Sequence, residues 1–519
     1  MGTVFRVAVL MAMVWGCVAG PFGAASHGKE KAERVRYTVH LAAERLPAAP
    51  SAGEGAAAAT GTVQPLLRGT WWAEVPAPLT TDGRLFVHLY ANAFRDDRAL
   101  AGPVWEEVLG KQRLPGRIDV ADVTVDGRPA RYAVRGTVLE VAVPRGRPCA
   151  VALRFTLHVP RNNGRLSYDA HAVWLGNALP ILAVRDAGGW RLDPYYPIGD
   201  PFYSEVADYH LQVTVPEGWQ VAATGWETLR EARDDRRRYA VHAEGVRDMA
   251  LVLVDSTYRV LEGRTPEGVR VRTWTRQGDR SELPRALHEA AVRSLSFFHR
   301  TYSPYPYPDY DVVRTGGFFG GMEYPGLVMV QGAYFGDERA RDDGLLVVAH
   351  ETAHQWWYGI VGNDEVREPW LDESLAQYST LQFLHSAYPR IARHMERMLY
   401  RHARHPQTVA WQRRGLSVRA PVYAFPNWTA YSLLVYERGG AALWELRRQV
   451  GEEAMNRALR RYARQHALRT ATGADLLRVL EGELGADLDR FFRYWFEGVG
   501  GPRPEVKARA PVFMPPGEP

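Results

Sequence analysis

Cysteine is almost missing from this sequence, which has two cysteines, Cys17 and Cys149, among 519 residues. Cys17 stands in the N-terminal segment VWGCVAG, so removal of that segment would leave Cys149 alone. A single cysteine cannot form an intrachain disulfide, even in a compartment that would permit one. The fold therefore cannot depend on a disulfide bond.

Long blocks of basic residues are also missing. The net charge is +5, from 64 lysines and arginines against 59 acidic residues, and the two signs are mixed along the chain. A protein that binds nucleic acid usually gathers its basic residues into a patch or a stripe. We therefore expect no nucleic-acid partner.

The N-terminal segment has a short apolar run from Val7 to about Ala19, which follows one arginine and precedes small residues near Ala25. Such a run is short for a bilayer span and is typical of a cleaved leader. We predict a signal peptide over residues 1–25 and an exported protein, either secreted, periplasmic or associated with the cell envelope. The alternative is a lipoprotein, anchored to the membrane through a lipidated Cys17.

With 519 residues, of which 46% are hydrophobic, the chain is long enough for two to four domains. Residues 30–254 alternate between apolar and polar positions, and VTVDGRPARYAV contains an Asp126-Gly127 hairpin turn. We predict an antiparallel β domain there, with residues 47–61, of low complexity, as a loop. The clearest alternation places these apolar residues on common faces: Val35, Tyr37, Val39 and Leu41, then Tyr209, Leu211, Val213 and Val215.

Residues 255–505 have a different pattern. The segment from Ser281 begins with a candidate N-cap and continues with apolar residues at helical spacing. Two short strand-like runs, DYDVVRT and GLVMVQG, come next, and helical segments follow almost to the end. The predicted fold class is therefore multidomain α+β, with a second α+β domain over residues 255–505 whose C-terminal part is helical. Residues 506–519 are predicted to be a loose tail.

The segment HETAH, residues 350–354, lies in a predicted helix, DDGLLVVAHETAHQWWYGIVG. Residues four apart on a helix share a face, so His350 and His354 can direct their imidazoles at one point, with Glu351 beside it. This spacing favours a zinc site. The alternative is a polar helix face whose histidines are hydrogen-bonded within the fold.

A catalytic zinc needs a third protein ligand and an open position for water. Glu373, 18 residues beyond His354, lies in a second predicted helix, REPWLDESLAQYSTLQFL, which can return to face the histidines. Its neighbour Asp372 points about 100° away around a helix. The predicted cofactor is thus one Zn²⁺ per chain, bound by His350, His354 and Glu373.

Taken with two further segments, this pattern resembles the aminopeptidase N family of gluzincin zinc metallopeptidases. GGMEYPG at 320–326 is similar to the exopeptidase motif GxMEN of that family, and YSLLVYERGG at 431–440 is similar to its tyrosine segment. The resemblance covers about residues 35–505. It implies a β domain followed by a thermolysin-like catalytic domain, and peptides as substrates.

The resemblance also implies residue roles. Water activated by the zinc would attack the peptide carbonyl, with Glu351 as general base and with Tyr436 stabilising the tetrahedral intermediate. Glu323 would bind the free α-ammonium of the substrate, and Gly321 and Met322 of the same motif would also be substrate-binding residues. Tyr431 is a second candidate for substrate binding.

Several features depart from the family pattern. Tyr324 replaces an asparagine, and Ser374 replaces a glycine. No counterpart of the family's amine-binding glutamine or glutamate is evident near GWRLDPYYPIGDP, residues 189–201. Because 83 residues follow Tyr436, we expect a short, bacterial-type member that lacks the large helical C-terminal domain.

Three functions stay open at this point. The first is an aminopeptidase. The second, favoured by the reduced set of amine anchors, is an endopeptidase or a dipeptide-releasing zinc peptidase. The third is a non-catalytic, zinc-bearing, peptide-binding module of the envelope. The presence of Glu351 and Tyr436 argues against the third, because binding alone needs neither a base nor an oxyanion donor.

Overall fold

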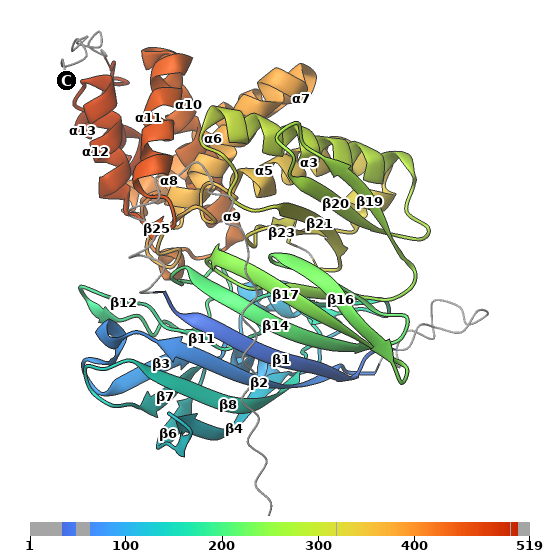
Figure 1. Ribbon diagram of the computed structural model, residues 1–519. Helices are drawn as coiled ribbons and strands as arrows, with labels where there is room; N and C mark the ends of the chain where they lie inside the picture. Colours follow the sequence, from blue (N-terminus) through green and yellow to red (C-terminus); the bar gives the residue numbers. More distant parts are fainter. Residues whose placement is uncertain (1–33, 48–62, 318, 499, 507–519) are drawn as a thin grey trace, which may run out of the picture. The chain divides into compact units, whose positions relative to one another are not determined.

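The first half of the described chain is built from β-strands, as the alternating pattern predicts (Figure 1). The computed structural model describes residues 34–47, 63–317, 319–498 and 500–506. The predictions for the signal peptide, for Cys17, for the loop after Pro47 and for the tail after Val506 concern residues outside these ranges. From Arg34 onward the chain forms one compact unit.

A large sheet dominates the first half. Its strands, in spatial order, are β16 (Trp226–Arg233), β17 (Arg236–Val246), β14 (Ala207–Pro216), β1 (Arg36–Arg45), β2 (Leu66–Val75), β8 (Cys149–His158), β4 (Arg117–Val125) and β5 (Arg128–Pro129). The pairs of this sheet are antiparallel as predicted, except that β1 and β14 run parallel. More than 150 residues separate these two strands, which is ample for the crossover that a parallel pair needs.

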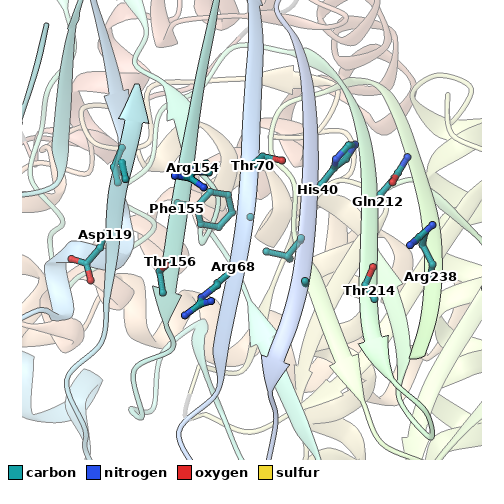
Figure 2. A pocket seen from close by; sticks show the side chains of 15 residues that line it. His40, Arg68, Thr70, Asp119, Arg154, Phe155, Thr156, Gln212, Thr214 and Arg238 are labelled. Atoms are coloured by element: carbon teal, nitrogen blue, oxygen red, sulfur yellow. The ribbon is translucent and has the colours of Figure 1, made fainter. Parts of the chain in front are cut away.

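One face of this sheet is polar and the other is buried. The predicted inward residues Tyr37, Val39 and Leu41 are buried. Outward-facing side chains, including His40, Arg68, Thr70, Arg154, Gln212 and Arg238, line a shallow groove on the opposite face (Figure 2). In β2, position 69 must be glycine, because a Cβ there would lie 2.4 Å from the ring of Phe155. This division is typical of a sheet that covers a core on one side.

Smaller strands complete the β half. Two four-stranded sheets contain β15 (Gln220–Ala223), β18 (Leu251–Val254), β10 (Ala172–Leu175) and β9 (Leu166–Tyr168), and β11 (Ile181–Leu182), β3 (Arg84–His88), β7 (Val138–Ala142) and β6 (Tyr132–Arg135). A hairpin joins β12 (Arg185–Asp186) to β13 (Gly189–Trp190). The short helices are η2 (Ala77–Thr80), η3 (Tyr90–Phe94), η4 (Asp97–Ala99) and α2 (Pro103–Leu109). The predicted turn at Asp126 and Gly127 is confirmed, and both residues have a positive φ.

The second half begins with a mixed five-stranded sheet. Its order is β19 (Tyr258–Arg264), β20 (Arg270–Arg276), β21 (Asp309–Thr315), β23 (Leu327–Gln331) and β22 (Gly321–Met322). The predicted strands DYDVVRT and GLVMVQG are confirmed as β21 and β23. Helix α3 (Glu282–Thr301) packs on β20 and on α5 (Arg341–Ala353). Ser281 precedes α3 as predicted, but its hydroxyl bonds Glu282 and caps no backbone N–H.

The remaining helical segments follow the order that the sequence predicts. They are α4 (Ala333–Gly336), η5 (Glu338–Ala340), α6 (Trp370–Ala387), α7 (Pro389–Ala403), α8 (Pro406–Arg413), η6 (Val422–Ala424), α9 (Trp428–Tyr431), η7 (Ser432–Arg438), α10 (Gly439–Val450), α11 (Glu452–Gln465), α12 (Gly473–Leu484) and α13 (Asp489–Phe496). Two short strands, β24 (Val361–Gly362) and β25 (Arg469–Thr470), pair in parallel. No helix among the described residues is long and apolar enough to cross a membrane.

Helix α5 ends earlier than the sequence predicts. The predicted helix runs to residue 362, whereas α5 stops at Ala353 and leaves His354 as its C-cap. Beyond this point Gly359 N–H donates to the carbonyl of His354, and the next residues continue the turn. Trp356 and Trp357 are both fully buried, as predicted, and the tertiary packing that buries them overrides the local helical pattern.

Candidate active site

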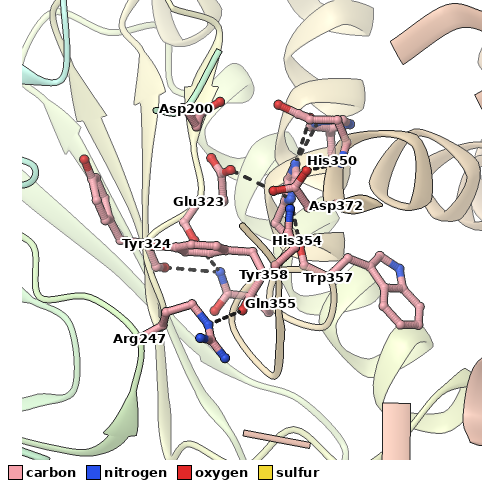
Figure 3. Close-up of polar contacts among 12 residues, drawn as sticks. Asp200, Arg247, Glu323, Tyr324, His350, His354, Gln355, Trp357, Tyr358 and Asp372 are labelled. Carbon is pink, nitrogen blue, oxygen red and sulfur yellow. Dashed lines mark hydrogen bonds and ion pairs between the residues drawn. The ribbon is translucent and has the colours of Figure 1, made fainter. Parts of the chain in front are cut away.

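Three potential metal ligands, His350, His354 and Glu373, converge on one point, and Figure 3 shows the two histidines side by side. His350 belongs to α5, His354 caps its end, and Glu373 lies in the first turn of α6. The Nε2 atoms of the two histidines are 3.1 Å apart, and Glu373 Oε2 lies 3.1 Å from one and 3.2 Å from the other. Ligand atoms of a tetrahedral zinc lie roughly 3.3 Å apart. The donor set therefore fits a zinc ion.

A hydrogen bond orients the side chain of His354. His354 Nδ1 lies 2.9 Å from the carbonyl oxygen of Trp357, which fixes the ring with Nε2 toward the other ligands. The backbone N–H of Glu373 donates to Asp372 Oδ1 over 2.7 Å. Asp372 is buried beside the site, and one of its oxygen atoms lies within 4.8 Å of ligand atoms of His354 and Glu323.

Electrostatics supports a cation at this point. Burial opposes ionisation of Glu373, but hydrogen bonds from His350 and His354 hold the pKa of its carboxyl well below the usual range. Burial likewise opposes a charge on His354, yet Glu323 and Glu373 hold the pKa of that imidazole well above its ordinary value. The protein therefore already stabilises positive charge between these side chains, where a metal ion would lie.

Glu351 faces the same cavity and depends on a glycine for its position. A Cβ at Gly321 would lie 2.3 Å from Glu351 Oε1, so only glycine leaves room for the carboxylate. Burial, followed by the nearby charge of Glu323, raises the pKa of Glu351 well above its ordinary value. Gly321, predicted as a substrate-binding residue, thus lines the cavity and also makes space for Glu351.

A pair of carboxylates lies beside the ligands. Glu323 is 3% exposed, and its Oε1 has no hydrogen-bond partner among the described residues. Oxygen atoms of Glu323, Asp200 and Glu373 lie within 4.8 Å of one another. Burial raises the pKa of Glu323 to about 8 and that of Asp200 to about 6. A buried oxygen without a donor is costly, so this pair is suited to bind a cationic group of a ligand.

Asp200 was missed by the sequence reasoning. Residues 189–201 contain no glutamine or glutamate counterpart, but Asp200 of that segment lines the cavity. The family residue is glutamine or glutamate, whereas aspartate has a shorter side chain and does not match that pattern. Arg165 NH1 lies 2.7 Å from Asp200, and this ion pair brings the carboxylate to the cavity edge. The available signal was a pair of acidic residues, Asp193 and Asp200, in a proline-rich segment.

Tyr436 lies in a π-helical turn, η7, and not in the regular helix that the sequence suggests. Its hydroxyl donates a short hydrogen bond to Glu373 Oε1, and its ring stacks on His350 with 5.7 Å between centroids. A π-helical turn inserts one extra residue and is frequent at functional sites. The turn directs the Tyr436 hydroxyl at the metal ligands.

Two predicted substrate-binding side chains lie elsewhere. Met322 is 1% exposed and packs in a separate apolar cluster with Trp174 and Met329. Tyr431 is fully buried behind Tyr436, and its hydroxyl lies against Gly199. Neither side chain lines the cavity, so their contribution to it is limited to supporting its walls.

The cavity has a volume of about 430 Å³ and is open on one side. Its lining combines the carboxylates and metal ligands with apolar groups from both halves of the chain. The further lining residues include Val108, Phe319, Leu346, Val347 and Trp428. Such a mixture of an apolar wall and a few charged groups is typical of a ligand-binding site.

Comparison with known proteins identifies the second half of the chain. Residues 286–495 match the Peptidase family M1 domain. They form an M1 domain. It contains the three ligands, Glu351, Glu323 and Tyr436, whereas Asp200 precedes it in the β half.

Curated relatives of this M1 domain are longer proteins. Aminopeptidase M1-B of Oryza sativa subsp. japonica is 27% identical over 460 residues, which are 82% of this chain and 50% of the relative. Aminopeptidase N of Streptomyces lividans is 26% identical over 242 residues, which are 43% of this chain and 27% of the relative. The chain therefore spans about half the length of these relatives, or less.

Solved structures show that the fold of both halves is shared. The M1 zinc metallopeptidase from Deinococcus radiodurans has a TM-score of 0.63 at 20% sequence identity, over 91% of this chain and 96% of that one. A mutant of that metallopeptidase bound to a Tyr-Ser-Ala substrate has a TM-score of 0.61. The prediction of a β-rich half followed by an α+β half with a helical C-terminal part is confirmed.

The two departures in the M1 domain both have structural reasons. Ser374 donates a hydrogen bond of 2.7 Å to the carbonyl of Val435, within the π-helical turn of Tyr436. Gly439 accommodates this serine, since a Cβ at Gly439 would lie 2.0 Å from its hydroxyl. Ser374 therefore supports the turn that positions the tyrosine.

Tyr324 points out of the active site. Its hydroxyl donates to Asn177 Oδ1 over 2.6 Å, in the β half, and Gly176 leaves space for it. The side chain of Gln355, one residue after His354, bonds the carbonyl of Tyr324 and the N–H of Gly326. The M1 domain is thus attached to the β half directly behind the loop that contains Glu323.

Proposed function

We propose that this chain is a zinc-dependent metallopeptidase that acts as an aminopeptidase on peptides with a free N-terminus. The observation that carries the proposal is the position of two carboxylates, the buried Glu323 and the partly buried Asp200, beside a three-ligand metal site. An α-ammonium bound between them would place the first peptide bond of the substrate next to the ligands.

Peptide hydrolysis at this site would need a bound metal and a residue that transfers a proton. When bound, zinc supplies a Lewis acid that lowers the pKa of a water molecule and polarises the peptide carbonyl. Glu351 is placed to take a proton from that water and to pass it to the leaving amine. The positive charges of the metal and of the substrate ammonium would lower the raised pKa of Glu351, so that the carboxylate is ionised when it is needed.

The defining experiment compares three fluorogenic peptides that differ only at the N-terminus, which is free, acetylated or extended by one residue. Zinc-loaded protein is expected to release the N-terminal residue of the free peptide and to be much slower on the acetylated one. Faster cleavage of the acetylated peptide would instead identify an endopeptidase. Zinc binding without turnover of any peptide would identify a binding module.

Replacing Glu373 with alanine is expected to remove the metal together with the activity. Two imidazoles alone make a poor zinc site, so zinc content should fall from about one per chain to well below it, as measured by elemental analysis after dialysis. Asp372→Asn is the matched control, since Asp372 is equally buried and adjacent. Loss of zinc in the control with retention in Glu373→Ala would show that the wrong carboxylate had been assigned.

Tyr436→Phe is expected to lower kcat by about 100-fold and to change KM little. The hydroxyl, once released from Glu373, can donate to the oxygen that develops negative charge in the transition state, and loss of such a donor costs about that factor. Steady-state kinetics on the peptide with a free N-terminus measures kcat and KM separately. Tyr431→Phe is the control, because its hydroxyl lies outside the cavity. Wild-type kcat in Tyr436→Phe would restrict this tyrosine to a packing role.

A further inference from the structure

We infer that Arg247, a residue of the β half, is a positioning residue for the metal ligand His354. The inference rests on the proposed function, since it assumes that His354 binds a metal ion. Arg247 lies between β17 and β18, more than 100 residues before the HETAH segment. Its side chain is 1% exposed and reaches the turn that follows α5 (Figure 3).

The guanidinium of Arg247 holds three separate segments of backbone. Nε donates to the carbonyl of Tyr358 over 3.0 Å, one terminal nitrogen donates to the carbonyl of Ser204 over 2.7 Å, and the other donates to the carbonyl of Arg469 over 3.1 Å. Ser204 returns a hydrogen bond from its hydroxyl to the carbonyl of Arg247 over 2.8 Å. The planar fork of arginine is suited to this task, because it offers several donors in fixed directions.

Tyr358 adopts a backbone conformation that must be held in place. Its φ is +125°, a region that residues with a side chain rarely occupy, and it is fully buried. The N–H of Tyr358 donates to the carbonyl of Val361 over 2.9 Å, and its own carbonyl accepts from Arg247. The peptide groups on both sides of this strained residue are therefore fixed by hydrogen bonds.

The peptide group before Tyr358 is the one that orients the metal ligand. The carbonyl of Trp357 belongs to it, and this carbonyl lies 2.9 Å from Nδ1 of His354. If Arg247 released the carbonyl of Tyr358, relaxation of φ would rotate this peptide group and move the carbonyl of Trp357. His354 would then lose the contact that directs its Nε2 toward Glu373.

Gly362 independently supports a specific role for the Arg247 side chain. A Cβ at Gly362 would lie 2.0 Å from the central carbon of the Arg247 guanidinium and would displace it. Gly362 is in β24, whose partner β25 begins with Arg469, the third backbone contact of Arg247. The turn after α5 and the strand pair beyond it are thus shaped around this side chain.

The test measures zinc affinity by competition with a chelator, in the full chain. Arg247→Lys keeps the charge but cannot reach all the acceptors, and Gly362→Ala keeps the arginine but displaces it. Both are expected to weaken zinc binding by about 10-fold, the low end of the range for loss of a group that orients a ligand directly. With cobalt in place of zinc, both should also alter the visible absorption spectrum of the metal.

Tyr307→Phe is the matched control. Its hydroxyl donates to the carbonyl of Gly245 over 2.9 Å, so this variant also removes a buried hydrogen bond at the end of β17, two residues before Arg247, but leaves the turn of Tyr358 intact. Its zinc affinity and cobalt spectrum are expected to match the wild type.

The outcomes separate this inference from the proposed function. A wild type that binds no zinc would defeat the proposed function. Wild-type zinc affinity in a folded Arg247→Lys variant would overturn the role of Arg247 alone, and so would equal weakening in Tyr307→Phe. Failure of both Arg247→Lys and Gly362→Ala to fold would also overturn it, because Arg247 would then serve the fold as a whole.

Discussion

Glu351→Gln is expected to lower kcat by at least about 100-fold while the protein keeps about one zinc per chain. Glutamine has nearly the same shape as glutamate and can occupy the space that Gly321 leaves, so the ligands should not move. It cannot accept a proton, and the base is lost. Kinetics on a free peptide and elemental analysis of the same sample measure both effects.

Glu437→Gln is the matched control for this experiment. Glu437 lines the same cavity and burial raises its pKa to about 7, but it belongs to none of the potential metal-binding groups among the described residues. Its replacement should leave kcat near the wild-type value. Near-normal turnover in Glu351→Gln would show that another group takes the proton and that the proposed mechanism is wrong.

Glu323→Ala is expected to reduce kcat/KM for free N-terminal peptides by an amount equivalent to about 2 to 4 kcal/mol, and to leave slow cleavage of acetylated peptides nearly unchanged. The reason is the buried Oε1 of Glu323, which has no hydrogen-bond partner in the described part of the chain and is available to pair with the substrate ammonium. The ratio of kcat/KM between free and acetylated peptides is the measured quantity. A similar loss on both peptides would indicate a structural role for Glu323.

Asp200→Asn completes this experiment. Asp200 is already paired with Arg165, so it should contribute less to ammonium binding than Glu323 does. We expect a smaller loss on free peptides in Asp200→Asn. In the double variant the losses should not add, because both carboxylates contact the same group. An unchanged kcat/KM in Asp200→Asn would place the ammonium at Glu323 alone, and additive losses would show that the two carboxylates do not share one bound group.

Much of the active site could be predicted because its signals are local. His350 and His354 are four residues apart on the last turn of a helix, and that spacing alone brings two imidazoles together. Glu373 follows in the next long helix at an interval that permits a return. The alternation in β1 and β14 likewise predicted which side chains are buried, because the two faces of a strand are set by the period of the backbone.

The errors arose where packing between distant segments overrides a local pattern. Helix α5 stops at Ala353 because the buried tryptophans and the turn at Tyr358 take the chain in another direction. Strands β1 and β14 run parallel because of a crossover that periodicity does not record. Tyr436 lies in a π-helical turn that Ser374 stabilises from another helix.

By itself, the sequence determined the metal-ligand set, the order of a β half and an α+β half, and the candidate base and oxyanion donor. Only the tertiary structure decided that Asp200 joins Glu323 at the cavity and that Arg247 reaches the turn behind His354. Ligand spacing on a helix follows from the geometry of neighbouring residues. Asp200 and Arg247 lie more than 100 residues before the HETAH segment, so their positions relative to the metal site depend on packing between distant segments, which no local pattern encodes.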